Sequence, residues 1–345
     1  MIPIQNIYYM LSYAFQILNE KGYKNIATEQ FNNTAELMAA ILEKGIAIQL
    51  KRGLGKEYIP QTEALSSLRG KIDIAESIKT QSMLRKQLIC TYDEFSVNSI
   101  MNRIIKSTVE LLLRSNISKQ RKKNLRKLMV YFSEVDFIDL YTVNWNVQYN
   151  RNNQTYRMLI SICYLVVKGL LQTQSNGHTK LMDFLDEQRM CRLYEKFILE
   201  YYRREFKNQI TANASQIPWQ LDNEENSMLP VMQSDIMLQS GEKVLIIDAK
   251  YYEHSTQVQF DKHTLHSGNL YQIFTYVKNK EYELREKDHT VSGMLLYAKT
   301  DEEIYPNNVY QMSGNQITVR TLDLNLPFDE IAGQLNTIAK THFDL

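Results

Sequence analysis

Two apolar runs, separated by Ser240-Gly241, dominate residues 231–251 of this 345-residue chain. Both runs are rich in β-branched and large aliphatic residues, and a Ser-Gly pair between such runs is typical of a two-residue turn. The pattern therefore predicts a β-hairpin. With the turn at these two residues, Asp235 on the first strand lies opposite Ile246 on the second.

Three of the charged residues on the predicted hairpin lie away from its turn: Asp235, Asp248 and Lys250. Because side chains alternate between the two faces of a strand, these three residues and Ile246 share one face. Asp235 is then a diagonal neighbour of Asp248, within reach of a common ligand.

The run KVLII at 243–247 predicts a buried strand, and charged side chains that follow it are costly unless they are paired or bound to a metal. One interpretation is a structural ion pair between Asp248 and Lys250. The other is a site for a hard divalent cation such as Mg²⁺, which prefers oxygen ligands from Asp235, Asp248 and the Ala249 carbonyl. In that site Lys250 orients an attacking water or stabilises charge on a transition state.

Helical spacing of apolar residues recurs before and after the hairpin. It predicts helices within 1–20, 34–50 (with Thr34 as the cap), 92–114, 155–171, 186–206, 268–279 and 328–341. The remaining pattern predicts a strand-and-loop region at 45–75, polar loops at 207–228 and 253–268, a strand at 292–298 and a hairpin around 304–306 and 315–324. Helix, hairpin, strand, helix and strand in this order indicate an α/β fold.

The polar segment QTQSNGHT at 172–179 is the clearest change of composition, and the length allows two domains. We therefore expect a division into residues 1–175 and 176–345. Three widely spaced cysteines without a CxxC pair argue against a disulfide framework or a zinc ribbon. The longest apolar run, 159–167, is too short for a membrane span, and the first residues lack the features of a secretory signal, so we expect a cytoplasmic protein.

The net charge of the chain does not indicate a nucleic-acid partner, because 40 Lys and Arg residues balance 39 Asp and Glu residues. Basic residues nevertheless gather within 45–75, where Arg52, Arg69 and Lys71 form either a solvated face or a partner contact. A second cluster lies within 114–127 and is able to neutralise phosphates, although an exposed helix face has the same composition.

Several segments, taken in order, resemble the McrC subunit family of the McrBC 5-methylcytosine restriction systems, within the PD-(D/E)xK nuclease superfamily. They are IPIQNIYYMLSYAF at 2–15, KRGL at 51–54, RGKIDI at 69–74, NRIIKST at 102–108, LYEKFILEYYRRE at 193–205, LIIDAKYY at 245–252 and NLYQIFTY at 269–276, together with the Asp235 hairpin. The resemblance covers essentially the whole chain. It implies an α+β protein with a mixed helical and β coupling domain, followed by a restriction-endonuclease-like α/β domain.

The resemblance also implies functional residues. The catalytic set maps onto Asp235, Asp248 and Lys250, with Ser234 in place of the proline that usually precedes the first Asp. Glu195 matches a helix carboxylate that assists metal binding. Gln272 and Tyr276 match the QxxxY motif of RecB-like nucleases, and their spacing places them on one helix face, where packing against the sheet is the alternative role. The implied metal ligands are Asp235, Asp248, Ala249 and Glu195, for Mg²⁺ with Mn²⁺ as a substitute.

The implied partners are a hexameric McrB-like AAA+ GTPase and double-stranded methylated DNA. Residues 53–58, GLGKEY, do not satisfy the GxxxxGK[ST] pattern, so we expect this chain itself to bind no nucleotide. Arg52, Arg69 and Lys71 are the hypothesised contacts with the GTPase. Two alternatives remain: a stand-alone RecB-like nuclease or resolvase, and a non-catalytic activator of an AAA+ motor.

Overall fold

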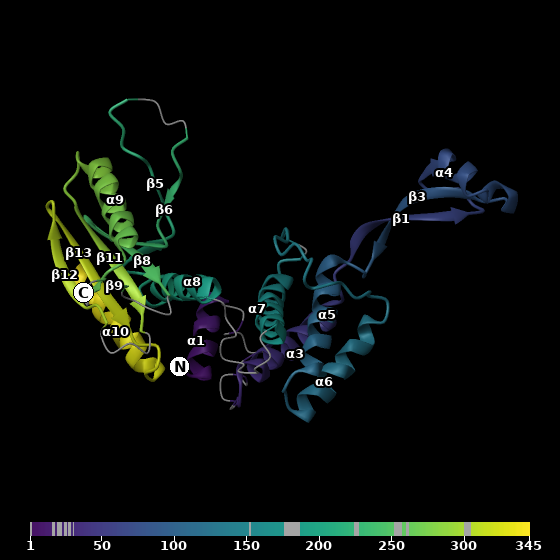
Figure 1. Cartoon of the computed structure of the whole chain (residues 1–345), viewed down its shortest axis with the longest axis horizontal. Helices are drawn as coiled ribbons and strands as arrows, with labels where there is room; N and C mark the ends of the chain where they lie inside the picture. The colour runs from purple at the N-terminus through teal and green to yellow at the C-terminus, as the bar shows by residue number, and fades with distance from the viewer. Residues whose placement is uncertain are drawn as a thin grey trace. The chain divides into compact units, whose positions relative to one another are not determined.

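The computed structural model describes the chain except for a few short segments. The described residues are 2–15, 18, 23, 26, 29, 31–151, 153–175, 187–223, 228–251, 257–259, 262–299 and 305–345. They form two compact units (Figure 1). Unit 1 contains the described residues of 1–27 and 185–345, and unit 2 contains those of 28–184.

A mixed six-stranded sheet forms the centre of unit 1, in the order β12-β13-β11-β8-β7-β4. Strands β8, β11 and β13 are parallel to one another, whereas β12, β7 and β4 pair antiparallel to their neighbours. The bounds are β4 Thr211–Asn213, β7 Ile236–Ser240, β8 Lys243–Lys250, β11 Thr290–Ala298, β12 Asn308–Met312 and β13 Asn315–Leu322. This arrangement confirms the expected mixture of helices with a sheet.

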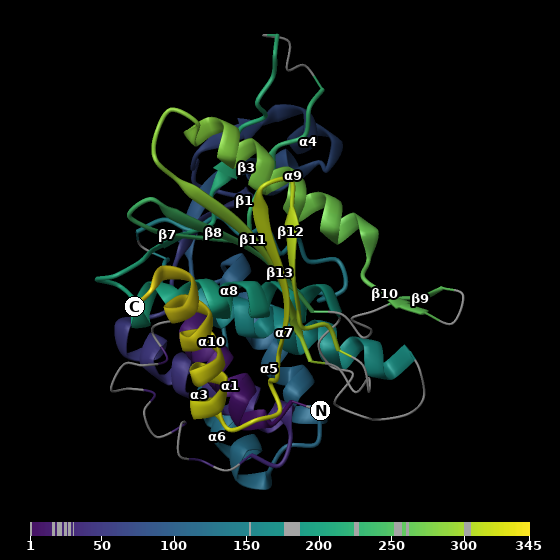
Figure 2. The same ribbon diagram turned by 90° about the vertical axis from the view of Figure 1, so that its left-hand side faces the viewer.

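Helices cover both faces of this sheet (Figure 2). One face packs its alternate apolar residues against α9, Ser267–Leu284, which contributes Ile273 and Val277 to the core. The other face carries α8, Glu187–Glu205, and α10, Phe328–Phe343. Gly293 on β11 lets α9 approach closely, because a Cβ there would lie within 2.9 Å of Ile273, Val277 and Ile317 side-chain atoms.

The first helix, α1 at Ile4–Ala14, belongs to unit 1 although it precedes unit 2 in sequence. Tyr13 donates a hydrogen bond to Glu205 of α8 at 2.9 Å, and Asn6 donates to the carbonyls of Leu324 and Leu326. The compact unit therefore differs from the expected division at residue 175, which grouped these residues with the N-terminal half. The expected boundary segment continues α7 as far as Ser175, and its remaining residues lie outside the described ones.

Unit 2 combines four longer helices with a small antiparallel sheet, β1-β3-β2, that projects from them (Figure 1). The helices are α3 Thr34–Arg52, α5 Ile100–Arg114, α6 Lys119–Met129 and α7 Tyr156–Ser175. The sheet has β1 Glu57–Leu65, β2 Lys71–Asp73 and β3 Leu88–Ser96, with the short helices α4 Ile74–Lys79 and η2 Ser82–Arg85 beside it; η3 is Val130–Phe132. At its base, Tyr156 donates to Asn102 and accepts from the Gly55 amide, which ties the sheet to the helices.

Two helix predictions in unit 2 need correction. The helix expected from residue 92 begins only at Ile100, because residues 88–96 pair with both β1 and β2 as the central strand β3. Ser99 caps this helix. At α3 the cap is Asn33 rather than Thr34, since the Asn33 side chain accepts the Glu36 amide hydrogen bond.

The polar stretch at 207–228 contains strands that the sequence pattern did not reveal. Besides β4, it holds β5, Gln216–Ile217, which pairs with β6, Met232–Gln233. The expected loop at 253–268 contains the short pair β9, Gln257–Gln259, and β10, Lys262–Thr264; its residues 253–256, 260 and 261 lie outside the described ones. Along the described helices, none is long and apolar enough to cross a membrane.

Candidate functional site

Asp235 and Asp248 face each other at one end of the central hairpin. Ser240 pairs with Lys243, so the two-residue turn is Gly241-Glu242 and not the expected Ser240-Gly241. Gly241 adopts a φ of +56°, which glycine tolerates without strain. The register therefore shifts by two residues, which keeps every side chain on its predicted face and moves Asp235 from opposite Ile246 to opposite Asp248.

Asp248 is a carboxyl group almost removed from water, with 1% of the residue exposed. Lys250 Nζ lies 2.9 Å from Asp248 Oδ2, so the ion pair expected as one interpretation is present. Apart from this pair, Oδ2 has no hydrogen-bond partner among the described residues. Burial nevertheless raises the pKa of Asp248 to about 7, with Lys250 acting to lower it and Asp235 to raise it. The ammonium therefore compensates only part of the cost of burying this carboxylate.

The second carboxylate is held by the backbone of the neighbouring strand. Asp235 Oδ2 accepts a hydrogen bond of 3.0 Å from the Ala249 amide. Asp235 precedes β7 directly and is partly exposed. Ser234, which stands where a proline was expected, is buried and donates through its backbone amide to Ser215. This contact fixes the chain immediately before Asp235.

Helix α8 brings Glu195 to the same site. Burial raises the pKa of Glu195, and the charge of Asp235 raises it further, which indicates that the two carboxyl groups interact. Cys191, one helical turn earlier, donates to Glu195 Oε1 at 3.1 Å. Sequence reasoning missed Cys191, although its spacing of four residues from Glu195 places both on one helix face. Burial raises the pKa of the Cys191 thiol to about 12, so it stays protonated and acts as a donor.

Helix α9 reaches the site through Lys250. The Lys250 ammonium donates to Gln272 Oε1 at 3.2 Å, and Gln272 Nε2 donates to the Tyr276 hydroxyl at 2.9 Å. Tyr276 is also part of the core beneath α9, with 8% of the residue exposed. Tyr276 thus packs on the sheet, and its hydroxyl accepts from the amide that accepts from Lys250, so the contacts are compatible with either expected role.

The donor set can be compared with the needs of a divalent cation. Over the described part of the chain, no three His, Cys, Asp or Glu side chains converge to enclose a metal. Asp235 and Asp248 remain as a facing pair, with an incompletely compensated negative charge at Asp248. Mg²⁺ is commonly held by one or two carboxylates, with water and substrate phosphate completing its shell. The two carboxylates therefore fit Mg²⁺ and do not fit a fully enclosed structural ion.

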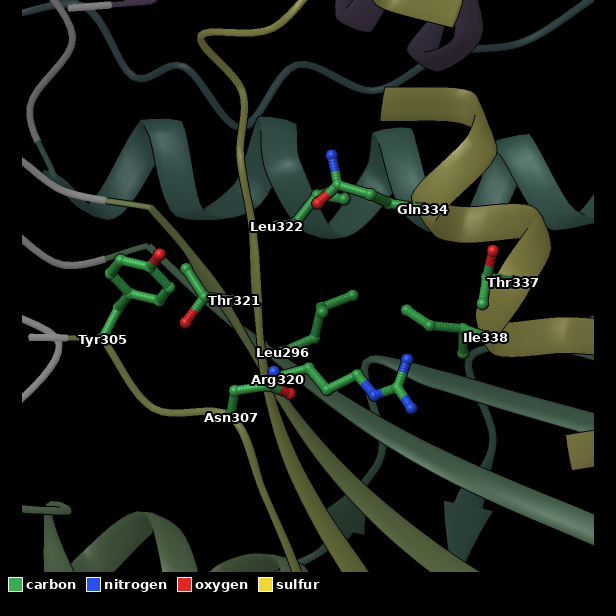
Figure 3. A pocket seen from close by; sticks show the side chains of 9 residues that line it. All are labelled: Leu296, Tyr305, Asn307, Arg320, Thr321, Leu322, Gln334, Thr337 and Ile338. Atoms are coloured by element: carbon green, nitrogen blue, oxygen red, sulfur yellow. The ribbon is translucent and has the colours of Figure 1, made fainter. Parts of the chain in front are cut away.

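A cavity of about 220 Å³ lies elsewhere in unit 1, between the strand ends and α10 (Figure 3). Arg320 of β13 and Ile338 of α10 are among its lining residues. None of the predicted site residues lines it. The carboxylates instead share a face with Ile246, which packs against α9.

The three residues expected to contact a partner lie in unit 2. Arg52 is the last residue of α3, so it belongs to a helix and not to the strand-and-loop region expected from residue 45. Arg69 stacks on the Tyr92 ring, with the guanidinium carbon 3.9 Å from the ring centroid. Lys71 begins β2 and is exposed. Lys71 therefore belongs to the projecting sheet and Arg69 to the loop between β1 and β2, whereas Arg52 precedes the sheet in the chain.

Comparison with solved structures gives two related complexes from Thermococcus gammatolerans. The first is a half-complex of McrB AAA+ hexamers with bound McrC: it covers 97% of this chain and 76% of that chain, with a TM-score of 0.48 and 18% identity. The second is the McrBC complex, which covers 59% of each chain with a TM-score of 0.42 and 21% identity.

The chain is 30% identical over 329 residues to the type IV methyl-directed restriction enzyme EcoKMcrBC of Escherichia coli strain K12, covering 94% of this chain and 93% of that protein. Residues 5–298 match the family model described as McrBC 5-methylcytosine restriction system component. This chain therefore belongs to the family of McrBC 5-methylcytosine restriction system components.

Proposed function

We propose that this chain is the nuclease subunit of a modification-dependent restriction system, hydrolysing DNA phosphodiesters with Mg²⁺ at a PD-(D/E)xK site. The observation that carries the proposal is the buried Asp248 carboxyl group, which faces Asp235 and keeps a raised pKa despite its contact with Lys250. A charge that the protein compensates incompletely supports a site completed by a cation. Family membership supports the restriction system as its context.

The side chains have distinct roles in this proposal. Asp235 and Asp248 hold the cation, to which the Ala249 carbonyl adds an oxygen ligand. When bound, Mg²⁺ neutralises charge on the phosphate and lowers the pKa of a coordinated water. Lys250, oriented by Gln272 at 3.2 Å, places a positive charge where negative charge develops on the substrate.

Glu195 acts beside the two aspartates. Its raised pKa means that it retains a proton to a higher pH than an ordinary glutamate, and its interaction with Asp235 makes that proton sensitive to the charge of the site. It therefore assists by accepting or donating a hydrogen bond next to the cation, with Cys191 as its fixed neighbour.

The proposed partner is a McrB-like AAA+ GTPase hexamer, and the proposed substrate is double-stranded methylated DNA. The curated relative from Escherichia coli is a methyl-directed restriction enzyme. In unit 2, the projecting sheet and its short helices expose apolar side chains that single domains usually bury, including Tyr58 at 73% and Leu84 at 81%. We place the GTPase contact on this sheet and on Arg52. Intact GTPase stimulation by an Arg52→Ala, Arg69→Ala double variant would refute that placement.

The test of the proposed activity is cleavage of methylated DNA by Asp248→Asn in the presence of Mg²⁺, GTP and the partner. We expect the cleavage rate to fall at least about a hundredfold, while stimulation of partner GTPase activity persists. Asp288→Asn, which alters an exposed aspartate of unit 1, is the control and should cleave normally. Retained cleavage by Asp248→Asn would place the catalytic site elsewhere.

The same assay separates the alternatives. Cleavage by the purified chain without GTP or partner would favour a stand-alone RecB-like nuclease or resolvase. GTPase stimulation without cleavage, and without binding of Mg²⁺ or Mn²⁺ in the presence of DNA, would favour a non-catalytic activator.

A further inference from the structure

Helix α6 of unit 2 concentrates positive charge to an unusual degree. Its eleven residues, KQRKKNLRKLM, include six Lys or Arg residues and no acidic residue. Helical geometry of about 100° per residue divides these six between two faces. Arg121 falls on the same side as Leu125, which is fully buried, while the other five lie within an arc of about 140° on the opposite side.

On the inner face of α6, glutamates of the same unit pair with the positive charge. Arg121 donates to Glu36 at 3.2 Å and to Glu43 at 2.8 Å, and it also pairs with Glu29. Only 13% of its side chain is exposed. The charge of Arg121 is therefore used inside unit 2 and is not offered to a partner.

The outer face has the opposite character. We call it the α6 basic face, and it consists of Lys119, Lys122, Lys123, Arg126 and Lys127. All are exposed except Lys122, which is partly exposed. Within the described ranges, none of the five forms an ion pair with a carboxylate.

This arrangement costs the isolated helix free energy. Lys119 and Lys123, Lys122 and Arg126, and Lys123 and Lys127 are like-charged pairs four residues apart, which destabilise a helix. The first turn contains Lys119 and Lys122 but no acidic residue, so positive charge lies at the positive end of the helix dipole. Glu36 accepts hydrogen bonds from the Ser118 amide and hydroxyl at the start of the helix, but no carboxylate of the described residues pairs with the five outer side chains, whereas a polyanion would neutralise them.

We propose that the α6 basic face binds the sugar-phosphate backbone of double-stranded DNA without reading its sequence. An eleven-residue helix is about 16 Å long, and duplex DNA presents about nine phosphate charges over that length. Tyr131, which follows the helix and is 67% exposed, adds a neutral hydroxyl donor suited to a phosphate oxygen.

The chemistry favours DNA over an acidic protein surface. Protein interfaces usually combine a buried apolar centre with a polar rim, and lysine is depleted in them. The α6 basic face contains four lysines and one arginine and no apolar side chain. It lies in unit 2, whereas the carboxylates lie in unit 1, so this inference does not depend on the proposed cleavage.

The test uses the full chain and measures duplex binding by fluorescence anisotropy over a range of salt concentrations. The test variant replaces Lys119, Lys123, Arg126 and Lys127 with Gln, which has a similar helix propensity. We expect weaker binding of methylated and unmethylated duplexes alike. The slope of log affinity against log salt should become shallower by about 0.9 for each lost phosphate contact, up to about 3.6.

The control variant removes the same amount of charge from scattered exposed positions, by Lys79→Gln, Lys207→Gln, Lys287→Gln and Lys340→Gln. It should leave the slope unchanged. The single substitution Lys123→Gln, which disturbs folding least, should reduce the slope by about 0.9. All variants carry Asp248→Asn, so that cleavage does not alter the DNA.

An unchanged affinity and slope in the four-residue variant would overturn the proposal. Loss of binding to the partner GTPase with unchanged DNA binding would also overturn it and assign the α6 basic face to an acidic protein surface. Loss of DNA cleavage by Asp248→Asn alone has no bearing on the outcome, because binding is measured separately from cleavage.

Discussion

Asp248 in unit 1 and Arg121 in unit 2 are both charged groups that folding removes from water, yet their surroundings differ. At Arg121, burial acts to lower the pKa, but hydrogen bonds and charges from Glu43, Glu29 and Glu36 raise it overall. At Asp248, Lys250 acts to lower the pKa, but burial outweighs it. At Arg121 the protein's own charges outweigh the cost of burial, whereas at Asp248 they do not.

The difference shows how a structural ion cluster can be distinguished from a ligand site. Both places combine acidic and basic side chains at close range, so residue type and proximity do not separate them. What separates them is whether the protein's own charges outweigh the cost of burial. At Asp248 the protein's own charges do not outweigh that cost, which is why we assign chemistry to that cluster and stability to the other.

The largest expected effect concerns stability. Arg121→Met leaves Glu36 and Glu43 without their cation and should lower the free energy of unfolding by about 3–5 kcal/mol. The control is Lys123→Met on the exposed face of the same helix, which should change stability by less than about 0.5 kcal/mol. Chemical denaturation followed by circular dichroism measures both. Equal effects of the two substitutions would contradict the structural role of Arg121, because it would then stabilise the protein no more than a surface lysine does.

The next effect concerns the pH dependence of metal binding. Asp248 must lose its proton to bind a cation, and its pKa is about 7 in the metal-free protein. The apparent affinity for Mn²⁺ should therefore rise up to about tenfold per pH unit below pH 7 and level off above it. Calorimetric titrations between pH 5.5 and pH 8.5 measure this dependence. An affinity that is flat across this range would mean that Asp248 is not a ligand.

The raised pKa of Asp248 also makes the stability of the folded protein depend on pH. In the metal-free protein, folded Asp248 holds a proton that the unfolded chain releases near pH 4. Protonation of Asp248 therefore stabilises the folded state at low pH, and this stabilisation is lost as the pH rises from about 4 to 7. Asp248→Asn should lack that part of the pH dependence in thermal unfolding.

The smallest effect concerns the orientation of Lys250. Gln272→Met removes the amide that accepts from the ammonium; because Lys250 keeps its contact with Asp248, we expect the loss to match that of a typical hydrogen bond, about 0.5–1.5 kcal/mol. The cleavage rate should accordingly fall about twofold to tenfold. Tyr276→Phe, which removes only the hydroxyl at the far end of the relay, should have a smaller effect. Thermal unfolding of both variants serves as the control, and a larger loss for Tyr276→Phe would contradict a positioning role through Gln272.

The local sequence pattern correctly predicted the features that depend on residues close together in the chain. Alternation along a strand correctly placed Asp235, Asp248 and Lys250 on one face, and this survived an error of two residues in the register because the period is two. Helical spacing likewise identified α8, α9 and α10 and the shared face of Gln272 and Tyr276.

Features that depend on distant partners became clear from the three-dimensional contacts and not from the sequence. Residues 88–96 form a strand because β1 and β2 pair on either side of it, and α1 joins unit 1 through contacts with residues near 205 and 325. The sequence pattern was enough to show which charged residues share a face, because side chains alternate along a strand. It did not show which of them the fold would compensate, because Arg121 meets glutamates 78 or more positions away, whereas Asp248 lies opposite Asp235, 13 residues away, and pairs with Lys250.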